Sequence, residues 1–132
     1  MTPKRIDSGV VYRRLRTMRK LLDELDKLGD VTRQQLADDL ATSLIVERIL
    51  TLLVDMAVSI NTHVSAAAGA APENYRSSFL AAAQAGLIAE DLAKELQPSA
   101  GLRNVLIHEY LEVDYDKVLV AVSAARVGYR AY

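Results

Sequence analysis

The residues best suited to chemistry lie in one stretch near the end of the chain, GLRNVLIHEYLEVDY, which spans Gly101–Tyr115. Arg103 is followed by His108, one of only two histidines, and then by Tyr110. Arginine offers a fixed fork of donors that matches phosphate oxygens, and histidine can take up and return a proton near neutral pH. With an RNA 2′-hydroxyl as internal nucleophile, such a pair is sufficient equipment for phosphodiester cleavage without a metal.

Helical geometry limits how these side chains can meet. At about 100° per residue, Tyr110 lies within about 20° of Arg103, whereas His108 lies about 140° away and one turn after Asn104. Either the helix ends near His108, or a second copy of the chain completes the site across a two-fold interface. The pattern therefore hints at a homodimer. A structural alternative remains open, in which Arg103 and Asn104 pair at a contact between helices.

Other kinds of site find little support in the sequence. The chain has no cysteine, which removes thiolate nucleophiles, disulfides and thiolate metal sites, and its six glycines form no nucleotide-binding loop. His63 is distant from His108 in the chain, and the carboxylates form no recognisable ligand set, so we expect neither a metal nor a cofactor. His63 precedes a loop and is expected to be a surface or capped histidine.

The elements around this stretch are expected to be helical. The 132 residues suit one domain, 1–132, and apolar residues recur at three- and four-residue spacing without strand-like alternation. We expect an all-α, antiparallel bundle of about five helices. Their approximate ranges are 8–28, 33–64 with a break near Ala41, 74–85, 89–109 and 115–130.

Local signals define several of these boundaries. Gly29 suits the left-handed residue after the first helix, and Thr32 with Gln35 matches a capping box that starts the second. Pro98 should kink the fourth helix or start it afresh, and Asp114 is a plausible cap for the last. The last helix is expected to turn three valines inward: Val118, Val122 and Val127.

Charge is unevenly distributed along the chain. The formal net charge is −1, yet residues 1–20 carry seven basic side chains against Asp7 alone. This basic segment could guide a polyanion, or form a solvated face whose charges are offset one turn later by Asp23, Glu24 and Asp26. The charged N-terminus is not a signal peptide, and charges interrupt the longest apolar run, so we expect a cytoplasmic protein outside the membrane.

GLRNVLIHEY followed by VDYDKV resembles the R-x-x-x-x-H-x-Y signature of HEPN domains, in particular the HepT toxin family. LIVERILTLLVDMAVSINTHV and APENYRSSFLAAAQAGLIAEDLAKEL are similar to the family's central helix and to its lead-in to the motif. The resemblance implies a HEPN-like homodimer whose two motifs face each other in one cleft, and metal-independent RNA cleavage that is toxic unless restrained. It assigns phosphate binding to Arg103, proton transfer to His108 and a positioning role to Asn104.

The same resemblance implies a regulator. The family's partner, MntA, is a small nucleotidyltransferase antitoxin that transfers AMP to the motif tyrosine, here Tyr110. Asp55 and Glu47 on the central helix could line the cleft or pair with Arg103, although a structural ion pair is the simpler role. A second function stays open, that of a non-catalytic HEPN binding module that docks a nucleotidyltransferase and presents a nucleotide or substrate to it.

Overall fold

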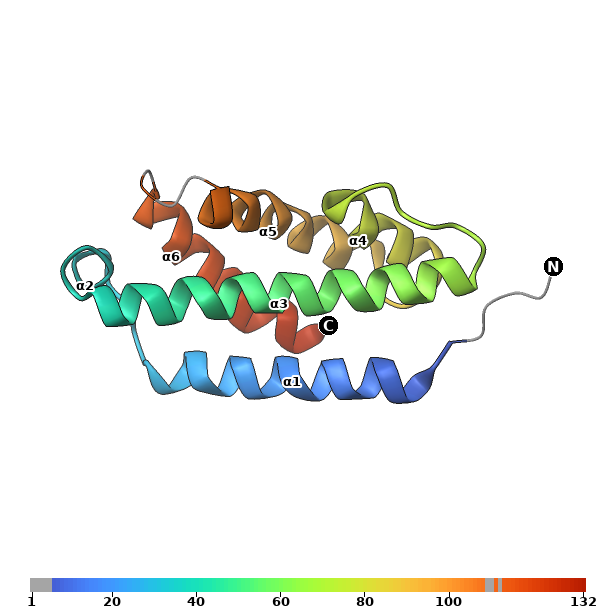
Figure 1. Ribbon diagram of the computed structural model, residues 1–132, viewed down its shortest axis with the longest axis horizontal. Helices are drawn as coiled ribbons and strands as arrows, with labels where there is room; N and C mark the ends of the chain where they lie inside the picture. Colours follow the sequence, from blue (N-terminus) through green and yellow to red (C-terminus); the bar gives the residue numbers. More distant parts are fainter. Residues whose placement is uncertain (1–5, 109–110, 112) are drawn as a thin grey trace.

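The computed structural model describes residues 6–108, 111 and 113–132. All regular elements within these residues are helical, as expected. Successive long helices run in opposite directions, which makes the fold an antiparallel bundle (Figure 1). The elements are α1 (Ser8–Lys27), α2 (Arg33–Asp38), α3 (Leu40–Ala67), α4 (Tyr75–Gln84), α5 (Glu90–His108), α6 (Tyr115–Ala124) and the π turn η1 (Ala125–Tyr129).

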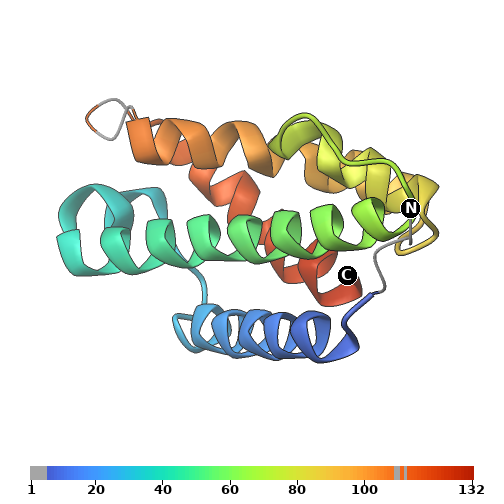
Figure 2. The ribbon, with the colours of Figure 1, turned by 45° about the vertical axis from the view of Figure 1, so that its right-hand side comes forward.

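The central helix α3 organises the bundle. It contacts α1 on one side and α4 and α5 on the other, and the same arrangement is visible after rotation (Figures 1 and 2). Every α-helix contributes apolar side chains to one core, including Met18, Leu22, Leu36, Val46, Leu53, Ile60, Phe79, Leu96 and Val118. Among the described residues, no helix combines the length and the apolar character needed to cross a membrane.

The predicted caps are present where the sequence places them. Gly29 follows α1 with a φ of 66°, in the left-handed region that glycine favours. The Thr32 hydroxyl accepts a bond from the Gln35 amide at 3.1 Å, and the Gln35 side chain accepts one from the Thr32 amide at 2.9 Å. Asp114 caps α6 by accepting from the Asp116 amide at 3.0 Å. These bonds satisfy amides that the first helical turns leave unpaired.

The break expected near Ala41 lies two residues earlier. Asp39 has an extended backbone, with φ −107° and ψ 95°, and its side chain accepts from the Thr42 amide at 3.3 Å. A capping carboxylate thus ends α2 and starts α3, which continues to Ala67, beyond the expected end at residue 64. The described residues consequently contain six α-helices where about five were expected.

Helix α5 passes through Pro98 without interruption, so Pro98 does not start a new helix. The Ser99 hydroxyl donates to the Leu96 carbonyl and shares a 2.7 Å hydrogen bond with the Tyr129 hydroxyl of the π turn. Tyr129 is buried, and desolvation raises the pKa of its phenol. This contact holds the C-terminal segment against the middle of α5.

The expectation that Val127 points inward is wrong. At about 100° per residue, Val127 lies about 180° from Val118 and about 140° from Val122, so a helix that buries those two valines turns Val127 outward. Residues 125–129 form a π turn. Val118 and Val122 are buried as expected, whereas Val127 is 72% exposed. Gly128 and Tyr129 take the inward positions instead. A Cβ on Gly128 would lie 2.9 Å from Leu96 Cδ2, so a larger residue there would require the buried Leu96 side chain to shift.

Candidate active site

Arg103 lies in the last two turns of α5 and is tethered to the central helix. Its Nε donates to Asp55 Oδ1 of α3 at 3.0 Å. The Arg103 side chain is 20% exposed and that of Asp55 is 30% exposed, so the pair lies at the edge of the interface between the two helices. A partly desolvated pair of this kind fixes the guanidinium more firmly than a surface ion pair would.

The ring of Tyr75 packs against one face of the same guanidinium. The Arg103 Cζ atom lies 4.8 Å from the centroid of the Tyr75 ring, a cation–π contact. The sequence predicts only that Tyr75 packs at a helix end. The Asn74 cap, which accepts from the Ser77 amide at 2.8 Å, makes Tyr75 the first residue of α4 and so sets its position beside α5. No spacing in the sequence relates Tyr75 to Arg103.

Buried polar groups support the turn that carries Tyr75. The Ser78 hydroxyl donates to the Tyr75 carbonyl at 2.7 Å, and the Asn61 amide donates to Ser78 Oγ at 3.2 Å. The Tyr132 hydroxyl donates to the Asn61 Oδ1 atom and to the Ala57 carbonyl. Desolvation raises the pKa of the Tyr132 phenol, so it remains a hydrogen-bond donor at neutral pH. The C-terminal residue is thereby linked through Asn61 and Ser78 to the helical turn that carries Tyr75.

Among the residues that the structure describes, no carboxylate pairs with either Nη group of Arg103, which leaves both for a ligand. Asp55 binds Nε and Tyr75 covers one face of the guanidinium, which leaves the Nη edge. Within the described residues, the contact made from that edge is a long 3.5 Å bond from Nη1 to Asn104 Oδ1. The exposed Asn104 amide therefore lies where it can position the arginine or a molecule bound to it.

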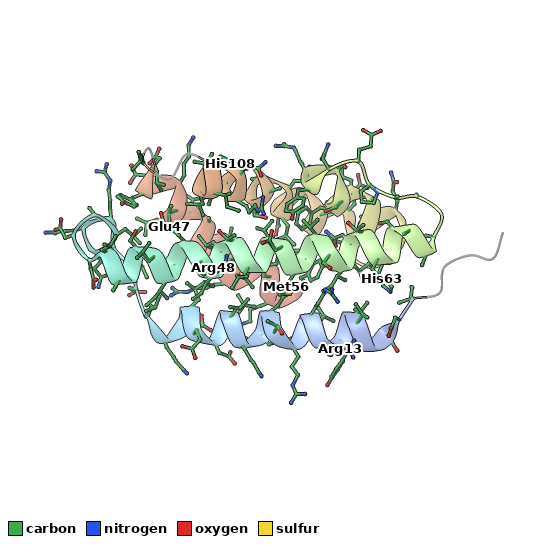
Figure 3. All side chains as sticks on the ribbon, viewed as in Figure 1. Arg13, Glu47, Arg48, Met56, His63 and His108 are labelled. Atoms are coloured by element: carbon green, nitrogen blue, oxygen red, sulfur yellow. The ribbon has the colours of Figure 1, made fainter. Side chains whose placement is uncertain are left out.

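His108 lies at the C-terminal limit of α5 and is exposed (Figure 3). Because residues 103–108 are helical, Arg103 and His108 project in directions about 140° apart. The structure therefore brings Arg103, Asn104 and Asp55 together. Among the described residues, His108 makes no hydrogen bond or ion pair with these three. Tyr110, the predicted acceptor of AMP, lies outside the described residues.

Glu47 lies two turns before Asp55 on α3 and makes no ion pair with Arg103 in the described part of the chain. It is half-buried, and desolvation raises the pKa of its carboxyl group. Figure 3 labels Glu47 toward the same end of the bundle as His108. The roles of Glu47 and Asp55 in a cleft remain predictions.

A groove of about 470 Å³ adjoins the Arg103–Asp55 pair along α3. Its lining includes Asp55, Ser59, Thr62, His63 and Tyr75. His63 Nε2 accepts a 2.8 Å bond from the Asp7 amide, which fits the expected capped histidine. The groove provides room for a ligand beside the arginine. No set of three or more potential metal ligands occurs among the residues that the structure describes.

Comparison with known families identifies the fold. A family model described as Ribonuclease HepT-like matches residues 18–126. The chain belongs to this family. The match covers the helices that carry Asp55, Tyr75 and Arg103, as well as the second half of the first helix.

Two curated members of this HepT-like family are similar in sequence. The tRNA nuclease HepT of Aphanizomenon flos-aquae is 31% identical over 129 residues, covering 96% of this chain and 87% of that protein. The mRNA nuclease HepT of Shewanella oneidensis is 27% identical over 118 residues, covering 87% of this chain and 86% of that protein. Both relatives match the HepT-like chain along nearly its whole length.

Two solved structures share the HepT-like fold. One is tri-AMPylated Shewanella oneidensis HEPN toxin in complex with MNT antitoxin, with a TM-score of 0.80 and 22% identity over 92% of this chain and 91% of that chain. The other is a toxin–antitoxin with AMP-PNP, with a TM-score of 0.80 and 23% identity over 92% of both chains. These matches confirm the predicted HEPN-like, all-α fold.

Proposed function

We propose that this HepT-like chain, as one domain spanning residues 1–132, is the toxin of a toxin–antitoxin pair. Its activity is endonucleolytic cleavage of cytoplasmic RNA without a metal ion. The observation that carries the proposal is the tethered guanidinium of Arg103, whose Nε and one face are occupied by Asp55 and Tyr75 while the Nη edge remains for a phosphate. Two curated family members are named as RNA nucleases, which supports the choice of substrate.

The chemistry requires one proton carrier and one cation. His108 removes the proton from the RNA 2′-hydroxyl, and the 2′-oxygen attacks the adjacent phosphorus. The bond between phosphorus and the 5′-oxygen then breaks, and that oxygen receives a proton from an imidazolium. Arg103 stabilises the added negative charge on the phosphate oxygens, with Asn104 positioning its Nη1. The products are a 2′,3′-cyclic phosphate and a 5′-hydroxyl.

A homodimer would bring the separated side chains together. Arg103 and His108 diverge on α5, so one copy directs them toward different places. In a two-fold dimer the same surface of each copy faces the other, so His108 of one copy can approach Arg103 of its partner. Exposed apolar side chains near His108, Ile107 at 39% and Leu111 at 87% exposure, favour burial of this end of α5 against another surface.

Regulation is proposed to act on Tyr110. An MntA-like nucleotidyltransferase antitoxin transfers AMP from ATP to the tyrosine oxygen, and pyrophosphate leaves. The Shewanella oneidensis HEPN toxin with a similar fold is tri-AMPylated and bound to an MNT antitoxin, which supports this partner and this modification. Tyr110 lies two residues after His108 in the chain, so added AMP places bulk and negative charge beside the catalytic groups and repels RNA.

Growth arrest on expression tests the proposed catalysis, and the mass of the intact protein tests the proposed AMP transfer. Expression of the wild-type chain alone should arrest growth and degrade RNA, whereas His108→Ala should do neither because it lacks the proton carrier. Persistent toxicity of His108→Ala contradicts the catalytic assignment. A stable nucleotidyltransferase complex with no RNA loss at high protein concentration supports the non-catalytic binding module. Coexpression with the nucleotidyltransferase should add AMP masses that disappear in Tyr110→Phe.

A further inference from the structure

The basic first part of α1 is not neutralised by the acidic residues later in the same helix. Asp23, Glu24 and Asp26 were candidates to offset its charge, one turn further along the helix. In the structure, Arg130 from the C-terminal segment contacts Asp23 at 2.9 Å and also pairs with Asp26. The other basic partners are Arg126, 3.5 Å from Asp26, and Lys27, 2.7 Å from Glu24. All three carboxylates are therefore paired with cations outside residues 1–20: Lys27, Arg126 and Arg130.

The basic side chains earlier on α1 are left without such partners. No ion pair within the described residues involves Arg13, Arg16, Arg19 or Lys20, and all four are exposed. At about 100° per residue they lie within about 120° of one another, away from the buried Met18 and Leu22. Figure 3 labels Arg13 on this helix. Four uncompensated cations on one face create a local positive potential on a chain whose net charge is −1.

An aromatic side chain and a hollow accompany these charges. Tyr12 is 68% exposed and lines a hollow of about 320 Å³ together with Arg16 and Arg19. Tyr129 and Tyr132 also line this hollow, and their hydroxyls are bonded within the protein. Exposed aromatic rings beside arginines are the combination with which proteins stack bases and hold the backbone of single-stranded nucleic acid.

We propose that the outer face of α1, formed by Tyr12, Arg13, Arg16, Arg19 and Lys20, is a second RNA-binding surface. Its cations contact backbone phosphates, and Tyr12 stacks a base at the mouth of the hollow. The inference rests on the proposed function in that RNA is the ligand. Helix α1 lies on the opposite side of α3 from α5, so this face captures RNA at a distance from Arg103 and takes no part in the chemical step (Figure 1).

Salt-dependent binding tests this surface without relying on cleavage. In a His108→Ala background, binding of a fluorescent single-stranded RNA is measured over a range of salt concentrations. The variant Arg13→Gln/Arg16→Gln/Lys20→Gln should bind more weakly and lower the slope of log K against log salt by about 2, since each phosphate contact contributes about 0.7. The matched control Lys27→Gln/Arg33→Gln/Lys94→Gln removes three cations that each have a carboxylate partner. It should leave the slope near that of the parent.

Tyr12 provides a second readout at fixed salt. Tyr12→Ala should reduce RNA affinity about fivefold or more, and Tyr12→Phe should retain it, because stacking needs the ring. Thermal melting of each variant confirms that it is folded.

Equal slopes for the two triple variants overturn the inference even if the wild type cleaves RNA. Loss of binding to the nucleotidyltransferase with unchanged RNA binding also overturns it, in favour of an acidic protein as the ligand. An α1-dependent slope in a chain that never cleaves supports the surface and contradicts only the proposed catalysis.

Discussion

Arg103 Nε lies 3.0 Å from Asp55 Oδ1, although the two residues are 48 positions apart in the chain. The bond joins the helix that carries the R-x-x-x-x-H-x-Y pattern to the helix at the centre of the bundle. It directs one edge of the guanidinium inward and leaves the other for a ligand. The partner of Arg103 within the fold is therefore a carboxylate of α3, and an incoming phosphate must bind beside that carboxylate.

Removing the tether should reduce catalysis more than binding. Asp55→Ala frees the guanidinium, and we expect kcat for RNA cleavage to fall about tenfold or more with a smaller change in KM. Asp55→Asn, which still offers an oxygen to Nε, should fall between Ala and wild type. Asp91→Asn, a carboxylate change near the start of α5 without contact to Arg103, is the matched control. Wild-type kcat in Asp55→Ala would show that the tether has no role.

The stacking of Arg103 on Tyr75 should appear as a coupling energy. A double-mutant cycle between Tyr75→Leu and Arg103→Met, measured by denaturant unfolding, should give about 0.5–1 kcal/mol. Tyr75→Phe keeps the ring and should preserve both stability and cleavage. A coupling energy of zero would mean that the two groups are merely neighbours.

Two glycines should respond in opposite directions to the same substitution. Gly128→Ala places a Cβ 2.9 Å from Leu96 Cδ2 and should destabilise the fold by about 1–3 kcal/mol. Gly101→Ala meets no atom within 4 Å and lies inside α5, so it should stabilise the fold by about 0.5–1 kcal/mol. Chemical denaturation of both variants checks the prediction. Equal effects would contradict the close packing of the π turn on α5.

Glu47 should make stability depend on pH in the acidic range. Burial raises the pKa of its carboxyl group above the unfolded value, so the folded state binds the extra proton. Stability from this group is present below the unfolded pKa and is lost as pH rises through the folded pKa. Glu47→Gln should accordingly be more stable than wild type at pH 7, with the difference shrinking toward pH 4. A difference that grows on acidification would contradict this environment for Glu47.

The sequence predicts local features of this fold better than its long-range contacts. Thr32, Gly29 and Asp114 mark boundaries correctly because caps are satisfied by residues a few positions away. Val127 is misplaced because it lies about 180° from Val118 around the helix. The π turn at residues 125–129 leaves no simple periodic signal in the sequence. Asp55 is accessible to sequence reasoning as a candidate, but Tyr75 is not, since its place beneath Arg103 follows from how α4 packs on α5.

The ends of the RNA products provide the most direct test of the proposed function. Purified wild-type protein is incubated with RNA in excess chelator, and the termini are identified by mass spectrometry. We predict 2′,3′-cyclic phosphate and 5′-hydroxyl ends for the wild type, and no cleavage by folded Arg103→Ala or His108→Ala. Cleavage that requires a divalent cation, yields 3′-hydroxyl and 5′-phosphate ends, or persists in His108→Ala would contradict metal-independent catalysis by Arg103 and His108.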